Sequence, residues 1–406
     1  MSKCIWYISK YFASSTKGNV GGRGYLLMKK IASLGYMPII ITSDSNQLNE
    51  VPDINGKYLH ELTDGIQMIW IRTMKYKVAK SIRRVFSWID FEIKLLLMSK
   101  SKLPNPDAVI VSSLSLLSVF NGLILKNKYR CELIFEVRDI WPLTLTEEGG
   151  FTKHNPFVIV LSFVEYIGYK YSDKIVGTMP NLSEHVANIL GYSKKTYCIP
   201  MGIDTDTLEN QSEVSFDYLQ KYIPNNKFIV VHAGTIGITN ALDIFFKCAV
   251  EMSDKSHIHF LIVGDGDLRE HYQSKYGHLP NLSFAPKVPK NMVQSILAHC
   301  DLLYFSVHQS KVWQYGQSLN KVIDYMLSGK PIVASYTGYP SMIDESGSGT
   351  FIPAGDVMAL KDEIMRYSAL NGEGYQKIGA AGREWLLENR SYELLAKQYL
   401  SIMFDK

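Results

Sequence analysis

The sequence predicts an α/β protein of two domains, each a parallel β-sheet wrapped by helices. Its 406 residues exceed one ordinary α/β core and suit two domains of about 200 residues each. Hydrophobic residues make up 46% of the chain and charged residues 20%, which is typical of a folded globular protein and not of a disordered one. Short apolar runs alternate with helix-length segments along both halves, the pattern of parallel β-α-β units.

Each half has its own series of strand-like runs. In the first half they are 5–8, 38–42, 68–71, 108–111, 132–137 and 174–176, and in the second half 228–234, 259–263, 301–305, 331–334 and 350–352. Between the two series, the segment CIPMGIDTDTL (198–208) contains Pro, Gly and Asp without helical or strand periodicity, so we place the domain junction there. We predict an N-terminal domain over 1–200, a C-terminal domain over 201–385, and a final segment, 386–406, whose helix crosses back to the N-terminal domain.

Charge, cysteines and hydropathy limit the class of protein. The formal net charge of +4 is modest for this length and does not indicate a nucleic-acid partner. The five cysteines lie far apart without metal-ligand spacing and are interpreted as reduced, buried thiols. We find no cleavable leader and no apolar segment of roughly 18 residues, so we expect a cytoplasmic protein.

A helix predicted over 319–328 is the first candidate binding site. Asn320 and Lys321 lie near its N-terminus, where unpaired N–H groups and the helix dipole favour a diphosphate. Asp324 follows Asn320 by four residues, so both share one helix face, and its carboxylate is placed to bind ribose hydroxyls. Gly329 can end the helix in a left-handed cap. A surface helix with a Lys321/Asp324 ion pair fits the spacing equally well.

The stretch SLNKVIDYMLSGKPIV (318–333) resembles the helix-Gly-x-Pro signature of family 4 glycosyltransferases, closest to bacterial O-antigen and capsule amino-sugar transferases. This resemblance implies a GT-B fold, in which two Rossmann-like domains have a cleft between them. It also implies that the domain over 1–200 binds the acceptor and that the domain over 201–385 binds the nucleotide-sugar. The family pattern has two glutamates eight positions apart. Asp324 matches the second, and the first would fall at Gly316.

The segment HAGTIG (232–237) follows an apolar strand and has the small residues that let a backbone approach a phosphate. Members of the family usually have an Arg after the first glycine and a Lys five residues further on, where this chain has Thr235 and Asn240. We therefore assign Gly234 and Thr235 to the donor site and expect Lys321 and Lys287 to meet the phosphate charge. An ordinary strand-to-helix turn is the alternative.

Gly264-Asp265-Gly266-Asp267 contains an Asp-x-Asp pair that could chelate a divalent ion. The tetrapeptide directly follows the strand HFLIV and precedes a helical segment, which favours a glycine turn. It also resembles the GDG turn of metal-independent GT-B enzymes. We expect no metal site and no cofactor.

In the first half, GNVGGRG (18–24) follows a strand and precedes a helix predicted over 25–34. Its backbone N–H groups, notably those of Gly21 and Gly22, are candidates to hold the sugar-side phosphate. Arg23 adds charge to this loop or is simply solvated.

The segment ELIFEVRDIWPL (132–143) ends a buried strand and brings Glu136, Arg138 and Asp139 to the edge where open α/β sheets bind ligands. We take these three as catalytic candidates. Asp139 would orient or deprotonate an acceptor hydroxyl, and Arg138 would hold a phosphate or sugar carboxylate. The alternative is an Arg138/Asp139 loop pair followed by a Trp141-Pro142 plug.

Two further segments have open interpretations. His308, Gln309 and Lys311 follow a strand in a polar loop and either line the donor sugar or are solvated. Residues 72–102 carry nine basic and two acidic side chains among apolar ones. This segment either lies on an anionic membrane or packs its apolar face on the first sheet.

These observations predict a retaining glycosyltransferase that moves a sugar from a UDP-sugar to a carbohydrate or polyprenyl-diphosphate-linked acceptor. Candidate donor sugars include N-acetylated amino sugars and deoxyamino sugars. Retention and the surface-polysaccharide role, O-antigen or capsule, come from the resemblance alone. A UDP-sugar 2-epimerase of similar fold and a noncatalytic scaffold of a polysaccharide complex remain alternatives.

Overall fold

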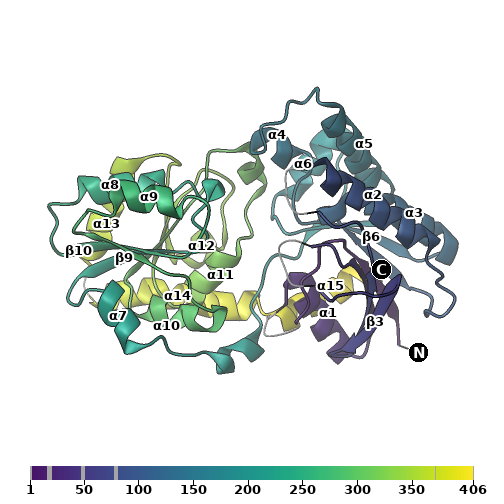
Figure 1. The fold of residues 1–406 in the computed structure, drawn as a ribbon, viewed down its shortest axis with the longest axis horizontal. Coiled ribbons are helices and arrows are strands. Elements are labelled where there is room, and N and C mark those ends of the chain that lie inside the picture. Colours follow the sequence, from purple (N-terminus) through teal and green to yellow (C-terminus); the bar gives the residue numbers. More distant parts are fainter. Residues whose placement is uncertain (1, 16–20, 47–50, 77–80, 371, 406) are drawn as a thin grey trace. The chain divides into compact units, whose positions relative to one another are not determined.

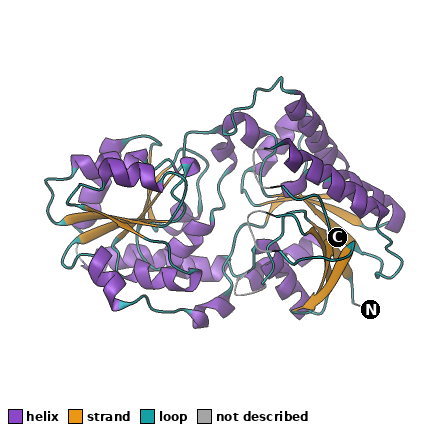
Figure 2. Cartoon of the chain, in the orientation of Figure 1, coloured by secondary structure: helices purple, strands orange, loops and turns teal. Residues whose placement is uncertain are grey.

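The computed structural model describes residues 2–15, 21–46, 51–76, 81–370 and 372–405. The chain forms two compact units: unit 1 is Met1–Pro200 with Tyr392–Lys406, and unit 2 is Met201–Ser391. Each unit is a β-sheet with helices on both faces (Figures 1 and 2). Residues 386–391, which the sequence placed in the final segment, belong to unit 2, because helix α14 (Gly372–Asn389) continues into them.

The sheet of unit 1 has eight strands in the order β3-β4-β2-β1-β5-β6-β7-β8. All neighbours are parallel except β3 and β4, which are antiparallel at one edge. The strands are β1 (Cys4–Ile8), β2 (Met37–Ser43), β3 (Tyr58–Thr63), β4 (Ile66–Ile71), β5 (Ala108–Ser112), β6 (Glu132–Val137), β7 (Lys174–Gly177) and β8 (Thr196–Cys198). Most are short apolar runs buried on both faces, as parallel strands covered by helices require.

Helices cover both faces of this sheet. Successive side chains of β6 point to opposite faces and so contact different helices. Phe135 packs against α5, while Ile134 belongs to the core that includes α1 and α15. Helices α1 and α15 pack on each other on one face, and α2, α3, α5 and α6 form the layer on the other (Figure 1). The helices are α1 (Arg23–Ser33), α2 (Ile82–Leu97), α3 (Ser118–Tyr129), α4 (Leu143–Glu147), α5 (Pro156–Tyr171), α6 (Leu182–Leu190) and α15 (Tyr392–Phe404).

The sheet of unit 2 is fully parallel, with the strand order β11-β10-β9-β12-β13-β14. The order reverses between β9 and β12, and open α/β sheets bind ligands beyond the carboxyl ends of strands at such a reversal. The strands are β9 (Phe228–Ala233), β10 (Ile258–Val263), β11 (Leu282–Ala285), β12 (Leu302–Ser306), β13 (Ile332–Ser335) and β14 (Gly349–Ile352).

Two apolar cores flank this sheet. One lies under α8, α9 and α13, and the other under α10, α11, α12 and α14. The helices of unit 2 are α7 (Phe216–Tyr222), α8 (Asp243–Glu251), α9 (Arg269–Tyr276), α10 (Val293–Ala298), α11 (Asn320–Leu327), α12 (Met342–Ser346), α13 (Val357–Ser368) and α14 (Gly372–Asn389). Helix α11 therefore lies on the face opposite α8, with its N-terminus in the region that follows β9 and β10.

Candidate functional site

The floor of the candidate site in unit 2 is formed by two loops that follow the adjacent strands β9 and β10. The N–H of Gly234 donates to the carbonyl oxygen of Val263 at 2.9 Å, and the N–H of Ile236 donates to that of Asp265 at 2.9 Å. The two loops are therefore hydrogen-bonded to each other along the edge of the sheet, and they form one surface.

Glycine is required where these loops touch. Gly264 has φ +151° and Gly266 has φ +153°, a conformation that other residues rarely adopt. A Cβ atom on Gly264 would lie 1.9 Å from the carbonyl oxygen of Gly234, and one on Gly266 would lie 2.4 Å from that of Ile236. The GDG segment thus forms the glycine turn expected from the sequence. The part of the chain that the structure describes has no cluster of three or more His, Cys, Asp or Glu side chains able to hold a metal ion.

Helix α11 starts beside this floor, one residue later than predicted, and it ends at Leu327, one residue earlier than predicted. Gly329, just after the cap residue Ser328, has φ +67°. The residue before the helix, Leu319, supplies no side-chain cap. The N–H groups of the first turn and the positive end of the helix dipole are the features that attract anions at such a terminus.

Lys321 extends from the first turn of α11 over the loop that follows β9. Its ammonium donates to Oδ1 of Asn240, whose amide donates in turn to the carbonyl oxygen of Thr235 at 2.9 Å. A Cβ atom at Gly234 would lie 3.8 Å from this ammonium. Burial lowers the pKa of Lys321 to about 8, because a charged amine is poorly solvated there. An anionic ligand bound here would provide a counter-charge for the ammonium of Lys321.

The alternative interpretation of the helix required an ion pair between Asp324 and Lys321. The structure does not show this pair. The carboxylate of Asp324 pairs with Lys290, which the sequence analysis did not single out because no spacing connects the two residues. Burial raises the pKa of Asp324, and the charge of Lys290 opposes that shift. The carboxylate faces the pocket one turn further along α11 than Lys321.

A pocket of about 530 Å³ lies between α11 and the two loops. This volume falls within the range of small-molecule sites in proteins. Six predicted donor-site residues line it, namely Gly234, Thr235, Lys287, Asn320, Lys321 and Asp324, together with Lys290 and apolar side chains such as Val288 and Ile296. Lys287 is exposed, and its ammonium lies 3.8 Å from a carboxylate oxygen of Asp265.

His232, at the end of β9, lies below this pocket and was not predicted as a site residue. Its Nδ1 lies 3.3 Å from the carbonyl oxygen of Tyr304, and its Nε2 has no hydrogen-bond partner among the described residues. Complete burial, with the nearby charge of Lys321, lowers the pKa of His232 to about 3. The imidazole is neutral at neutral pH.

The glycine loop of unit 1 is described only in part, because 18–20 lie outside the described residues. Gly21 has φ +79°, and a Cβ atom there would lie 2.7 Å from the ring of Tyr25. The N–H of Gly22, the residue before α1, donates to the carbonyl oxygen of Ala13 at 2.9 Å. These two glycines belong to unit 1, whereas the other predicted donor-site residues belong to unit 2.

Glu136 and Arg23 form a fully buried ion pair, with 2.7 Å between Nη1 and Oε1. The carboxylate also accepts from the hydroxyls of Tyr7 at 2.6 Å and Tyr399 at 3.2 Å. Burial raises the pKa of Glu136, but the charge of Arg23 and these hydrogen bonds outweigh it, so the pKa is lowered overall. The carboxylate has no exposed surface, which favours a structural role for Glu136 over the predicted catalytic one.

Arg23 is also not the solvated loop residue that the sequence analysis allowed for. Besides Glu136, its guanidinium donates to the carbonyl oxygens of Ile199 at 2.6 Å and Pro200 at 3.1 Å. It therefore fixes the end of unit 1 to the start of α1. Sequence separation hid this partnership, because Arg23 and Glu136 are 113 positions apart.

Arg138 and Asp139 follow β6, and unlike Glu136 they reach the surface. The hydroxyl of Ser113 accepts from the N–H of Arg138 at 2.9 Å and donates to the carbonyl oxygen of Asp139 at 3.0 Å. Ser113, the residue after β5, therefore holds the backbone of both residues. Trp141 packs edge-on against Trp88, as the plug interpretation predicts.

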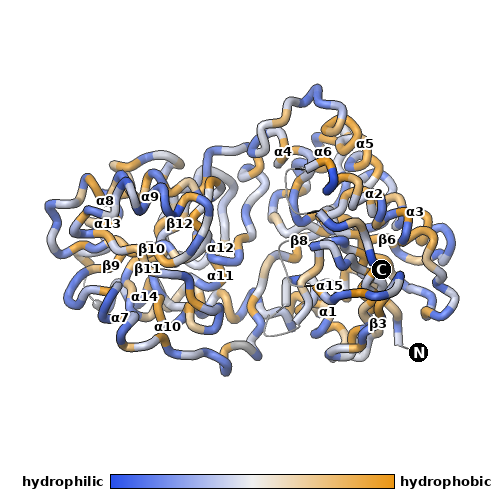
Figure 3. The backbone as a smooth tube through the Cα atoms, in the orientation of Figure 1, coloured by the Kyte–Doolittle hydropathy of each residue, from blue (hydrophilic) through white to orange (hydrophobic). Residues whose placement is uncertain are grey.

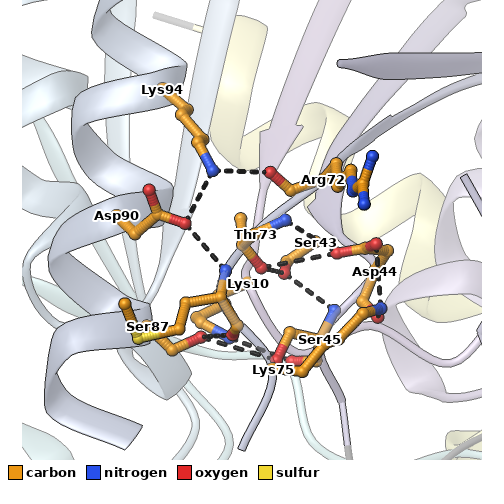
Figure 4. A network of polar contacts seen from close by, with 11 residues as sticks. Lys10, Ser43, Asp44, Ser45, Arg72, Thr73, Lys75, Ser87, Asp90 and Lys94 are labelled. Atoms are coloured by element: carbon orange, nitrogen blue, oxygen red, sulfur yellow. Dashed lines mark hydrogen bonds and ion pairs between the residues drawn. The ribbon is translucent and has the colours of Figure 1, made fainter. Parts of the chain in front are cut away.

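A polar network at the neighbouring carboxyl ends of β1, β2 and β4 was not predicted (Figure 4). Buried Lys10 donates to the carbonyl oxygen of Ser45 at 2.9 Å, and Asp44 pairs with Lys75 at 2.8 Å. Asp90 of α2 pairs with Lys94 at 2.8 Å and accepts from the N–H of Met74. Burial, aided by nearby basic groups, lowers the pKa of Lys10 to about 7. The network ties α2 to the edge of the sheet.

His308 and Lys311 lie in the loop after β12 and are exposed, as is Gln309. Nε2 of His308 lies 2.7 Å from the carbonyl oxygen of Ile238. None of the three residues lines the 530 Å³ pocket.

Comparison with known proteins agrees with this geometry. Residues 227–369 match the family model described as Glycosyl transferases group 1, and this region contains the pocket. No curated protein matches the sequence. This stretch of unit 2 is therefore similar to the glycosyltransferases that the model describes.

Solved structures with the same architecture cover nearly the whole chain. Sucrose-phosphate synthase from Thermosynechococcus elongatus is 16% identical, with 98% of each chain covered and a TM-score of 0.71. A trehalose-6-phosphate protein from E. coli bound with UDP-2-fluoro glucose is 10% identical, covers 100% of this chain and 99% of its own, and has a TM-score of 0.75. WaaG, a glycosyltransferase involved in lipopolysaccharide biosynthesis, is 15% identical over 99% of this chain and 100% of its own, with a TM-score of 0.65. The chain thus has the GT-B fold, with two Rossmann-like units.

Proposed function

We propose that the protein is a retaining glycosyltransferase that moves a sugar from a UDP-sugar to a carbohydrate acceptor. The observation that carries this proposal is the position of Lys321. Its ammonium and the N-terminus of α11 face the glycine loop from the opposite wall of one pocket. Structural neighbours of the same fold have UDP or UDP-sugars bound.

The proposed chemistry uses charge and not a metal ion or cofactor. Lys321 and the N–H groups at the start of α11 neutralise the diphosphate, Asp324 binds the ribose hydroxyls, and the Gly21-Gly22 loop contacts the sugar-side phosphate. Because the departing UDP is stabilised, the anomeric bond can ionise. Asp139 orients the acceptor hydroxyl, and Arg138 holds an anionic group of the acceptor.

The proposed acceptor is a lipid-linked or oligosaccharide intermediate of a surface polysaccharide such as O-antigen or capsule. The candidate donor sugars include N-acetylated amino sugars and deoxyamino sugars. The resemblance of 318–333 to family 4 glycosyltransferases supports this choice, as does the similarity to WaaG. The proposed location is the cytoplasm, at the inner face of the cell membrane.

Calorimetric titration with UDP and with a panel of UDP-sugars tests the donor site. Lys321→Ala removes a charge-assisted contact worth about 1.5–3 kcal/mol, so UDP affinity should fall about 10- to 100-fold. Asp324→Ala should also weaken binding. Lys247→Ala, which removes an exposed helix lysine outside the pocket, should change nothing.

Absence of UDP binding by the unmodified protein would leave only the scaffold alternative. If UDP binds, incubation with a UDP-sugar and no acceptor separates the two enzyme classes. Conversion of the sugar under those conditions identifies an epimerase, whereas a transferase requires the acceptor.

A further inference from the structure

One face of unit 1 exposes large apolar side chains on three neighbouring helices. Helix α3 contacts both α2 and α5, and the three lie together in the outer layer of the unit (Figures 1 and 3). The exposed residues are Ile82, Phe86, Ile89, Ile93, Leu96 and Leu97 on α2, Phe120 and Ile124 on α3, and Ile159, Val160, Phe163 and Tyr171 on α5. We call these residues the three-helix patch. Large exposed apolar areas of this kind mark surfaces that contact a partner or a membrane.

The patch is not needed to hold the helices on the sheet. Trp88, Phe91 and Leu95 of α2 are buried on the inner side, and α5 buries Leu161 and Val164 in the same way. A helix at the surface of a water-soluble protein normally pairs such an apolar inner face with a polar outer face. Here the outer face is apolar as well. We therefore expect these outer side chains to contact a partner or a membrane.

The inner side also fixes α2 firmly, so that the patch is presented by rigid elements. The carboxylate of Glu92 accepts from the hydroxyl of Ser118 at 2.6 Å and from the amide of Asn121 at 2.7 Å, both on α3. Asp90 holds the other edge of α2 through the network of Figure 4. These contacts leave the apolar outer stripes of α2 and α3 side by side.

The charged side chains that α2, α3 and α5 expose are basic. Arg83 precedes Phe86 by three residues, Lys128 follows Ile124 by four, and Lys170 follows Phe163 by seven. The acidic side chains of these helices are occupied internally: Asp90 pairs with Lys94, Glu92 bonds to α3, and Glu165 bonds to His185 at 2.7 Å. The patch thus combines apolar groups with positive charge, which matches an anionic surface and repels a second copy of itself.

We infer that the three-helix patch docks the protein on an anionic lipid bilayer. The apolar side chains insert between lipid headgroups, and Arg83, Lys128 and Lys170 contact the anionic headgroups. Among the residues that the structure describes, no helix has the length and hydrophobicity to cross a bilayer, so the helices lie in the interface. From the basic segment 72–102 this surface uses side chains of α2, and it adds those of α3 and α5; residues 77–80 of the segment lie outside the described residues.

Co-sedimentation of the full-length protein with vesicles tests this inference independently of the donor site. Vesicles of phosphatidylcholine are compared with vesicles of phosphatidylcholine and phosphatidylglycerol in equal amounts. The protein should bind the mixed vesicles more strongly, and added salt should weaken this binding. Phe86→Ser, Ile93→Ser and Phe163→Ser together should reduce binding on the order of ten-fold or more.

The matched control combines Leu62→Ser, Phe216→Ser and Met358→Ser. These three apolar side chains are about as exposed as the three substituted in the patch, or more so, and they lie on other elements. This variant should bind as the unmodified protein does. Arg83→Glu, Lys128→Glu and Lys170→Glu together should weaken binding to the mixed vesicles only.

Three results would overturn the inference: no binding to either vesicle, equal loss of binding by the control variant, or a dimer in sedimentation velocity that the patch variant converts to a monomer. The last result would identify a second copy as the occupant. UDP titration of the same variants shows whether the donor site is intact, so failure here is separable from failure of the proposed function.

Discussion

Lys321 supplies a positive charge that the resembled family usually has on its glycine loop. That family usually has a Lys five residues after the Arg of its glycine loop, and this chain has Asn240 there. The ammonium of Lys321 reaches from α11 to that same Asn240. The charge is therefore supplied by a helix in place of the loop, and a diphosphate would meet it at the floor of the pocket.

The burial of Lys321 makes UDP affinity dependent on pH. With its pKa lowered to about 8, the free protein loses this charge as the pH rises through that value. A phosphate binds the protonated amine, so affinity should fall between about pH 7 and pH 9. Lys321→Arg keeps its charge and should remove most of this dependence in calorimetric titrations. An equally steep decline in the arginine variant would assign the effect to another group.

Glu136 is a structural residue, and stability measurements can distinguish this role from a catalytic one. Glu136→Gln leaves Arg23 buried without its counter-charge, which typically costs about 3–5 kcal/mol. Denaturant unfolding should show this loss. Asp139→Asn, at an exposed site, should change the free energy of unfolding by less than about 0.5 kcal/mol while lowering transferase activity. A fully stable but inactive Glu136→Gln protein would restore the catalytic assignment.

At the scale of elements, the contact between the loops after β9 and β10 is the feature on which the pocket depends. Gly264→Ala places a Cβ atom 1.9 Å from the carbonyl oxygen of Gly234, so the loops must separate. Gly355 has φ +101° with no atom within 4 Å of a built Cβ, so Gly355→Ala imposes conformational strain alone.

Thermal or denaturant unfolding should show a loss of about 1–2 kcal/mol for Gly355→Ala and a larger loss for Gly264→Ala. Gly264→Ala should also lose UDP binding, since its backbone shift moves the floor of the pocket. If the two variants were equally stable and both bound UDP, the loop contact would not define the site.

Local pattern was sufficient to predict most of the fold. Strands such as β1 and β10 are short runs of apolar residues that can only be buried, and α11 has a clear end at Gly329. Strand β3 was missed because its half-exposed YLHELT sequence lacks an apolar run, and β8 and β11 have three and four residues. Such strands depend on their neighbours in the sheet for stability.

The site was predictable where its residues are close in sequence. The helix periodicity placed Asn320 and Asp324 on one face with Lys321 near the same N-terminus, and all three line one pocket. Lys290 and His232 were missed because their partners, Asp324 and Tyr304, are brought near only by the fold. The buried ion pair of Glu136 was not predicted for the same reason, since a carboxylate at a strand end is equally consistent with a ligand site and with a buried partner.

At the scale of the whole molecule, α15 completes unit 1 although it follows unit 2 in the chain. Its side chains Leu395, Ala396, Tyr399 and Met403 are buried in the core with α1. Burying a large apolar side chain contributes about 1.5–3 kcal/mol, and a domain is stable by only about 5–15 kcal/mol. Losing this helix should therefore unfold unit 1.

Truncation after Ser391 tests this expectation by limited proteolysis. Cleavage should concentrate in residues 2–200, while residues 201–391 stay resistant and continue to bind UDP. Truncation after Phe404 is the matched control and should leave both units resistant. Equal resistance of unit 1 in the two truncated proteins would contradict the prediction.

The place of α15 in unit 1 also has a consequence during synthesis. A ribosome makes all of Met201–Ser391 before it makes the helix that completes the first unit, so the second unit can fold while the first still lacks part of its core. The apolar surface of α1 that later contacts α15 is then exposed in the nascent chain. Folding of the first unit should thus finish last, which reverses the usual order in which domains fold as they leave the ribosome.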